Sequence, residues 1–200
     1  MKKASKIKVL LLAAVIALPM LYPVAMVSAS TTPIGATATF LSALTLTPTS
    51  IKFGKIIFGA APTAADTVTL TTGGGISYAG TFSAQAGGTV AAGDVAITGT
   101  PGNVLTVACS TSGTLAQASG AGRIAINSIK VANLSAAAGG GVACAGTGTQ
   151  VLTFTLTTGT NDHVRVGGKI DGGTTTSFAS GDYDTGNTGG TSINVDINYQ

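Results

Sequence analysis

Residues 192–199 read SINVDINY, and polar and apolar side chains alternate without a break in this stretch. The apolar positions are Ile193, Val195, Ile197 and Tyr199. Successive side chains of a β-strand point to opposite faces of a sheet. The stretch therefore predicts a C-terminal β-strand with one buried face and one polar face.

The same alternation recurs along the chain and predicts an all-β fold. Short alternating or apolar runs occupy positions 51–58, 68–70, 95–97, 105–109, 152–156 and 164–166. Ile126 and Ile129 lie on either side of a change of phase, which predicts a β-bulge. Turn signals such as Gly99-Thr100-Pro101-Gly102 separate the runs. We expect a single immunoglobulin-like or pilin-like β-sandwich of about nine to eleven short strands.

The first 29 residues have the pattern of an export signal. Four lysines precede an unbroken apolar run at 9–18, and Val27-Ser28-Ala29 supplies small residues for cleavage after Ala29. An uncleaved membrane anchor over 9–27 is the alternative, although two prolines interrupt that stretch. We expect residues 30–200 to form one domain that is secreted, at the cell surface or in the periplasm. The export signal would be its only contact with a membrane.

Charge and composition exclude several classes of function. Four of the ten cationic residues lie in the export signal, so six remain against seven acidic residues, all of them Asp. A nucleic-acid partner is not expected, because such binding needs clustered Lys and Arg. The chain has no Glu and no Trp, and His163 is its only histidine. Asp162 beside it would point to the other face of a strand. We therefore expect neither catalysis nor a cofactor.

Cys109 and Cys144 are the only cysteines and predict a disulfide in an exported chain. The closed loop of about 36 residues would stabilise the fold by about 4 kcal/mol in the chain-entropy account. A redox pair would normally be closer in sequence. A zinc site would need further ligands, which only His163 and the Asp residues could supply.

Asp182 and Asp184 are the weak candidates for a metal site. They lie two residues apart, which would place them on one face of a strand, and Gly186 follows as in a fragment of a calcium-binding loop. The full loop spacing and a closing Glu are absent. We therefore expect solvated turn residues, with a weak calcium site as the alternative and no other metal ligands.

Four motifs together resemble the bacterial domain-of-unknown-function family 4402, a set of exported Gly- and Thr-rich β proteins. The resemblance covers residues 36 to 199, and its middle part, 110 to 150, matches loosely. It implies export and a β fold, but no reaction and no catalytic residues. The matching motifs are Ala36-Thr37-Ala38-Thr39, Phe53-Gly54-Lys55-Ile56, Ile97-Thr98-Gly99-Thr100-Pro101-Gly102, and Gly181-Asp182-Tyr183 followed by Val195-Asp196-Ile197-Asn198-Tyr199.

The two ends of the domain also resemble pilin subunits, which implies self-association or assembly with other surface subunits. In pilins an N-terminal segment completes the sheet of a neighbour by β-augmentation, and the final strand is an edge for docking. Here the alternative is that the N-terminal stretch is simply the first strand of its own sandwich. The donor-strand positions would be Ile34, Ala36, Ala38, Phe40, Leu44 and Leu46.

The leading hypothesis from the sequence is an exported, non-enzymatic structural protein of the cell surface or the extracellular medium, with a pilin- or adhesin-like role. The alternative is a periplasmic or extracellular binding module with an unidentified ligand. The loop at 182–186 would then form one wall of its pocket.

Overall fold

The computed structural model describes residues 37–59, 62–134, 140–157, 162–174 and 178–200. The chain divides into a short unit, Met1–Thr39, and the unit Phe40–Gln200, which carries every strand described below. Of the first unit, residues 37–39 are described, and they are exposed and outside any strand. The predicted export signal, Ile34 and Ala36 lie outside the described residues.

The described residues form an all-β sandwich, which confirms the predicted fold class. They hold fourteen strands, more than the number predicted, because the short or Gly- and Ala-rich strands carry little alternation. A 3-10 turn, η3 (Gly172–Thr174), follows β12. The strands are β1 (Thr45–Thr49), β2 (Lys52–Ile57), β3 (Thr67–Leu70), β4 (Ile76–Ala79), β5 (Ser83–Ala91), β6 (Gly93–Thr98), β7 (Val104–Cys109), β8 (Gly113–Gln117), β9 (Arg123–Asn133), β10 (Val142–Ala143), β11 (Gly146–Thr155), β12 (Asp162–Asp171), β13 (Tyr183–Asp184) and β14 (Val195–Tyr199).

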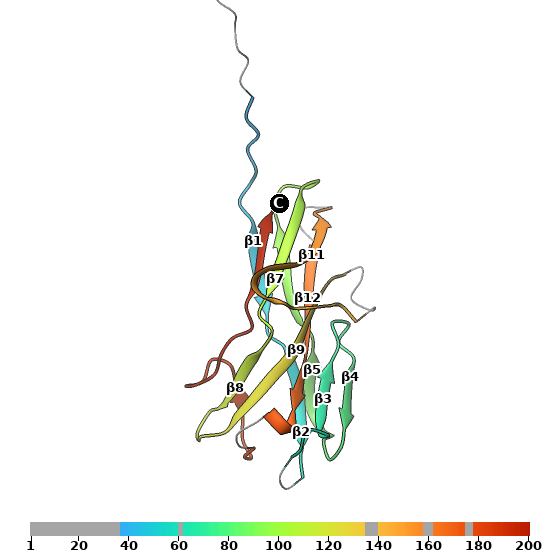
Figure 1. Cartoon of the computed structure of the whole chain (residues 1–200), viewed down its shortest axis with the longest axis vertical. Helices are drawn as coiled ribbons and strands as arrows, with labels where there is room; N and C mark the ends of the chain where they lie inside the picture. The colour runs from blue at the N-terminus through green and yellow to red at the C-terminus, as the bar shows by residue number, and fades with distance from the viewer. Residues whose placement is uncertain (1–36, 60–61, 135–139, 158–161, 175–177) are drawn as a thin grey trace, which may run out of the picture. The chain divides into compact units, whose positions relative to one another are not determined.

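The strands form three sheets (Figure 1). The largest, sheet A, has the order β1-β6-β12-β9-β8-β13. In addition, β10 pairs with β9, and β3 of the β3–β4 hairpin pairs with the C-terminal half of β12. Sheet C has the order β11-β7-β14, and sheet B is the β2–β5 pair. All these pairings are antiparallel.

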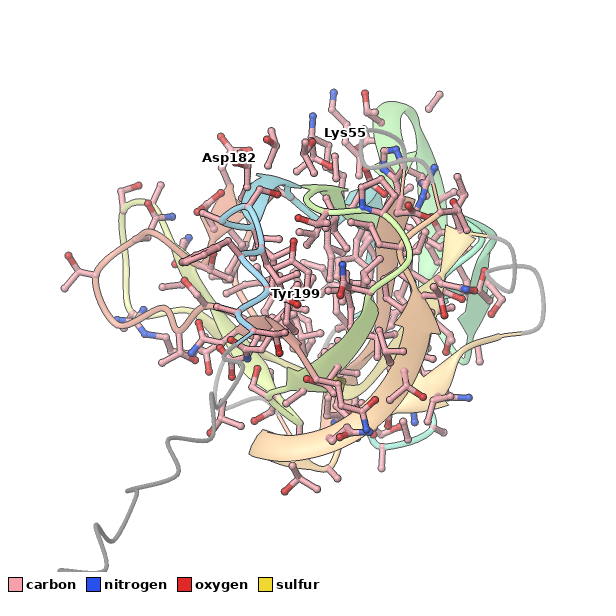
Figure 2. All side chains as sticks on the ribbon, turned by 90° about the horizontal axis from the view of Figure 1, so that it is seen from above. Lys55, Asp182 and Tyr199 are labelled. Carbon is pink, nitrogen blue, oxygen red and sulfur yellow. A yellow bond between two sulfur atoms is a disulfide. The ribbon has the colours of Figure 1, made fainter. Side chains whose placement is uncertain are left out.

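The core lies between sheets A and C and is built by alternation. In β12, Val164 and Val166 are buried while Arg165 between them is partly exposed, and in β7 Leu105 and Val107 are fully buried. Viewed from above, Tyr199 lies among the interior side chains, whereas Lys55 and Asp182 lie at the rim (Figure 2). The apolar faces predicted from period two therefore meet in one cluster.

The predicted bulge lies in β9 at Ser128. This residue has a positive φ of 50°, and Ser128 and Ile129 together oppose the single residue Gly168 of β12. The extra residue shifts the phase, so that Ile126 and Ile129 both face the core. A Cβ on Gly168 would lie 2.9 Å from each of these two side chains. The glycine therefore gives the bulge room to pack.

The predicted terminal strands are shorter in the structure. Ala38, Phe40 and Leu44 precede β1, and of the proposed donor positions only Leu46 lies in a strand. In the described part of the chain, no strand pairs with residues 37–44, so their alternation is not used within the domain. Over residues 37–44 the structure therefore contradicts the alternative that this stretch is the first strand of its own sandwich.

The C-terminal strand begins at Val195, so placing Ile193 in that strand was also wrong. The physical reason is a change of sheet. Thr191 forms a bridge with Thr114 of β8 in sheet A, whereas Val195 pairs with Cys109 of β7 in sheet C. Ile193 lies where the chain crosses between the two sheets.

Asp66 is a buried carboxylate that holds together the loop before β3. It accepts hydrogen bonds from the amide of Thr81 and from the amide and hydroxyl of Thr63, the latter two at 2.6 and 2.9 Å. These donors hold the pKa of Asp66 well below its usual range, and the Thr81 amide has the largest effect. A side chain on Gly80 would collide with this carboxylate.

We expect Asp66→Asn to destabilise the domain at neutral pH and to have a smaller effect in acid. The ionised carboxylate is favoured in the folded state, so its contribution is present above the unfolded pKa of about 3.9 and is lost as the pH falls below it. Urea unfolding of both proteins between pH 7 and pH 2.5 measures this difference. A difference in free energy of unfolding that stays constant over this range would contradict the assignment.

Candidate functional site: a groove between two sheet edges

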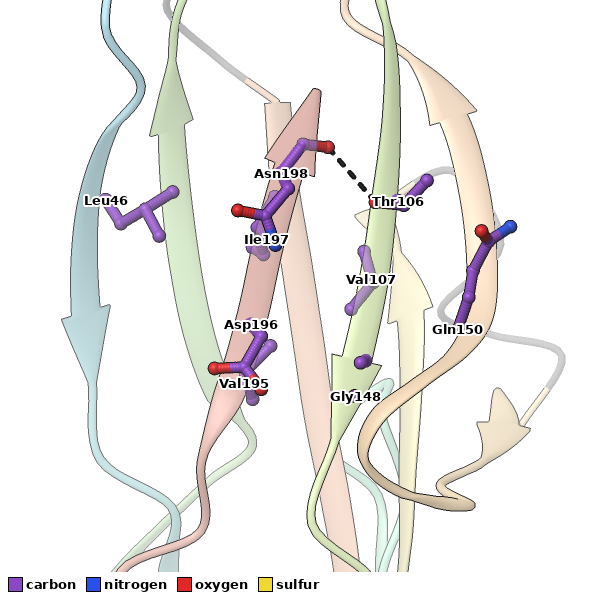
Figure 3. A pocket seen from close by; sticks show the side chains of 10 residues that line it. Leu46, Thr106, Val107, Gly148, Gln150, Val195, Asp196, Ile197 and Asn198 are labelled. Atoms are coloured by element: carbon purple, nitrogen blue, oxygen red, sulfur yellow. Dashed lines mark hydrogen bonds between the residues drawn. The ribbon is translucent and has the colours of Figure 1, made fainter. Parts of the chain in front are cut away.

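The sandwich has two strand edges that face one another across a gap. Within the described residues, β1 pairs only with β6 and β14 pairs only with β7, so each has one free edge. The two strands run in opposite directions (Figure 3). Pro48 removes one backbone donor from β1, whereas the five residues of β14 all keep their N–H groups. The edge of β14 is therefore the better template for another strand.

The gap between these edges opens into the interior of the sandwich. It forms a groove of about 610 Å³, bounded on one side by Leu46 to Ile51 and on the other by Ser192 to Asp196. Its floor is apolar, because core side chains from the inner face of sheet A reach it. These floor residues are Val95, Leu115, Ile126 and Val166.

A shallower hollow of about 520 Å³ adjoins this groove on the outer face of sheet C. It shares Leu46, Val195 and Asp196 with the groove and extends across β7 to Gln150 of β11. Figure 3 shows these strands with Thr106, whose hydroxyl donates to the carbonyl of Asn198 at 3.3 Å. The hollow therefore widens the approach to the free edge of β14.

A hydrogen-bond network ties the entry of β1 to the end of β14. The amide and the hydroxyl of Ser42 each lie 2.8 Å from the Thr100 hydroxyl, and the Thr100 amide donates to the Tyr199 phenol oxygen at 2.7 Å. That last bond lowers the pKa of Tyr199. Leu44 packs beside it, and a Cβ on Gly99 would come within 2.7 Å of both Leu44 and Tyr199.

The chain just before this network exposes apolar side chains. Phe40 is 92% exposed and Leu41 is 42% exposed, whereas Leu44 is partly buried against the core. Leu46 is 37% exposed at the lip of the groove. The domain therefore offers an uncovered apolar segment and an apolar groove.

The predicted Cys109–Cys144 disulfide is confirmed. Its two Cα atoms lie 5.3 Å apart. Cys109 ends β7 in sheet C, opposite Val195, while Cys144 directly follows β10, which pairs with β9 of sheet A. The bond therefore joins the two sheets beside the start of β14.

The two calcium candidates are both exposed, Asp182 just before β13 and Asp184 as the last residue of that short strand. The carboxylate of Asp184 accepts a hydrogen bond from the Gly186 amide at 2.7 Å, and Asp182 is exposed. Among the described residues, no three His, Cys, Asp or Glu side chains gather in a way that could hold a metal ion. Asp184 also lines the groove, which places the predicted 182–186 loop at its wall.

His163 lies in β12, an inner strand of sheet A that pairs with both β6 and β9. In β12 it points to the outer face of sheet A, and its Nδ1 lies 2.8 Å from Asp94 of the neighbouring β6. Arg165 Nε lies 3.0 Å from the other oxygen of Asp94, without the alignment of a hydrogen bond. The partner of His163 is therefore Asp94 rather than the adjacent Asp162. Sequence spacing could not reveal this pairing.

The chain matches no protein-family model, and neither a curated protein nor a solved structure is significantly similar to it. The resemblance to the domain-of-unknown-function family 4402 therefore stays a prediction. In the part of the chain that the structure describes, no helix is long and apolar enough to cross a membrane.

Proposed function

We propose that this protein is an exported, non-enzymatic structural subunit of the bacterial surface or extracellular medium, whose copies associate by strand addition. The observation that carries the proposal is the groove between β1 and β14, which combines a free strand edge with an apolar floor. Backbone groups of an added strand would pair with β14, and its alternate side chains would cover the floor.

The donor in this proposal is the segment of residues 34–41 of a second copy. Ile34, Ala36, Ala38 and Phe40 form one apolar face, and Thr or Gly stands between them. In the described part of this segment, Phe40 is nearly fully exposed and no strand covers it. Eight residues are enough to pair along the five residues of β14.

The size distribution of the mature chain, residues 30–200, tests this proposal. We expect concentration-dependent dimers or longer assemblies in sedimentation and light scattering. Phe40→Asp should yield monomers, because it would place a charge over the apolar floor. Thr39→Asp is the matched control, since this neighbouring position belongs to the polar face of the segment, and it should associate like the wild type. Equal association of both variants, or a monomeric wild type together with a Phe40→Asp variant whose groove takes up no added segment, would refute strand addition.

A binding module is the second candidate, because polar side chains gather at one wall of the groove. Asp184, Thr185, Ser192, Asn194 and Asp196 all line it. Such a set could orient a small polar ligand above the apolar floor. A wild-type chain that is monomeric, leaves its groove open and binds members of a glycan array, with binding lost in Asp196→Ala, would favour this candidate over assembly.

A further inference from the structure

We infer that the network of Ser42, Thr100 and Tyr199 keeps the donor segment out of the groove of its own domain, so that the segment enters only a second copy. The inference rests on the proposed strand addition, because it concerns which of two grooves the same segment fills. It assigns a positioning role to three residues outside the groove floor.

The first step is the location of the network. Ser42 precedes the first residue of β1 by three positions, and Tyr199 is the last residue of β14. Hydrogen bonds through Thr100 connect the two, so the network joins the chain entering β1 to the end of β14, and Leu46 at the lip of the groove follows Ser42 by four positions. Phe40 and Leu41, which precede Ser42 by two and one positions, are both exposed.

The second step is the turn that self-insertion would need. To lie between β1 and β14, the segment would have to reverse direction at residues 42–44 and run back along β1. The commonest hairpin turns, which have two-residue loops, need residues with positive φ, usually Gly, Asn or Asp. The chain has Ser42, Ala43 and Leu44 here, and none of these is Gly, Asn or Asp.

The third step is the cost of releasing the chain from its present path. A reversal would break both hydrogen bonds between Ser42 and Thr100. It would also pull Leu44 away from Gly99 and from the core cluster. Phe40 and Ala38, the donor positions nearest the network, would be the ones most hindered from reaching their own groove. The groove of a second copy carries no such constraint.

The test uses the mature chain and a synthetic peptide of residues 33–41 as the probe. Phe40→Asp, with a weakened donor, should be monomeric and bind the peptide. A release variant combines Thr100→Val with an Asn-Gly insertion between Ala43 and Leu44, which supplies a hairpin turn. We expect this variant to be monomeric and to bind the peptide about 100-fold more weakly than Phe40→Asp does, because its own segment fills the groove at a high effective concentration.

Two further variants keep the result interpretable. Tyr199→Phe removes the acceptor of the Thr100 amide without an insertion and should shift association in the same direction by a smaller amount. Thr71→Val is the matched control, since it removes a threonine hydroxyl that bonds Gly75 in the β3–β4 turn and should not change association. Circular dichroism of each variant verifies that it is folded.

The possible outcomes distinguish a failure of this positioning role from a failure of strand addition itself. If the release variant associates like the wild type, or is monomeric and still binds the peptide like Phe40→Asp, the positioning role is wrong. If the wild-type chain is monomeric and does not bind the peptide, whereas Phe40→Asp does bind it, the segment fills its own groove. This result would overturn the inference and leave strand addition standing. If Phe40→Asp also refuses the peptide, strand addition itself fails.

Discussion

Replacement of both Cys109 and Cys144 by serine should lower the free energy of unfolding by about 2–5 kcal/mol. The bond closes a long loop of chain, because the two cysteines have a sequence separation of 35, and it joins sheet A to sheet C. Cys109 is fully buried, so the serine hydroxyl would also enter an apolar site. Guanidinium unfolding of oxidised wild type and variant measures the loss.

Reduction of the wild type separates the contribution of the disulfide from the effect of placing serine hydroxyls in an apolar site. Dithiothreitol should destabilise the wild type and leave the double serine variant unchanged. Because Cys109 opposes Val195, the first residue of β14, we also expect weaker association of the serine variant near its unfolding midpoint. A wild type whose stability is the same with and without reductant would contradict a structural role for the disulfide.

Leu105→Ala should cost about 2–5 kcal/mol, because it opens a cavity where sheets A and C meet. Leu105 is fully buried in β7, and it lies opposite Tyr199 of the neighbouring strand β14. Val104→Ala is the control on the same strand, since Val104 is 38% exposed on the opposite face and should cost less than about 1 kcal/mol. Urea denaturation of both variants gives the two values. Similar losses would contradict the assignment of Leu105 to the buried face of β7 and of Val104 to its exposed face.

Strands with strong alternation could be predicted from the sequence, and weakly alternating ones could not. The runs at β3, β6, β7 and β12 have branched or large apolar residues at every second position, and the structure places them in the core. In contrast, β5 (Ser83–Ala91) consists mainly of small and polar residues that are largely exposed. Its place in sheet B depends on the partner strand β2, which no local pattern encodes.

The candidate site was predictable in its parts but not in its assembly. The exposed donor positions, the C-terminal strand and the 182–186 loop were each visible as patterns. Their meeting around one groove follows from the crossing of the chain from β8 to β7 between Thr191 and Val195. The link from Ser42 to Tyr199 spans almost the whole domain in sequence, and hydroxyl groups of this kind carry no distinctive spacing.

The amino-acid sequence alone determined the all-β class, the β-bulge near Ser128 and the disulfide, because side-chain alternation, phase changes and cysteine number are local or countable properties. The tertiary structure decided which strand edges stay unpaired, that core side chains line the groove between β1 and β14, and that His163 faces Asp94. These features depend on contacts between residues far apart in the chain, and such contacts exist only once the sheets have chosen their partners.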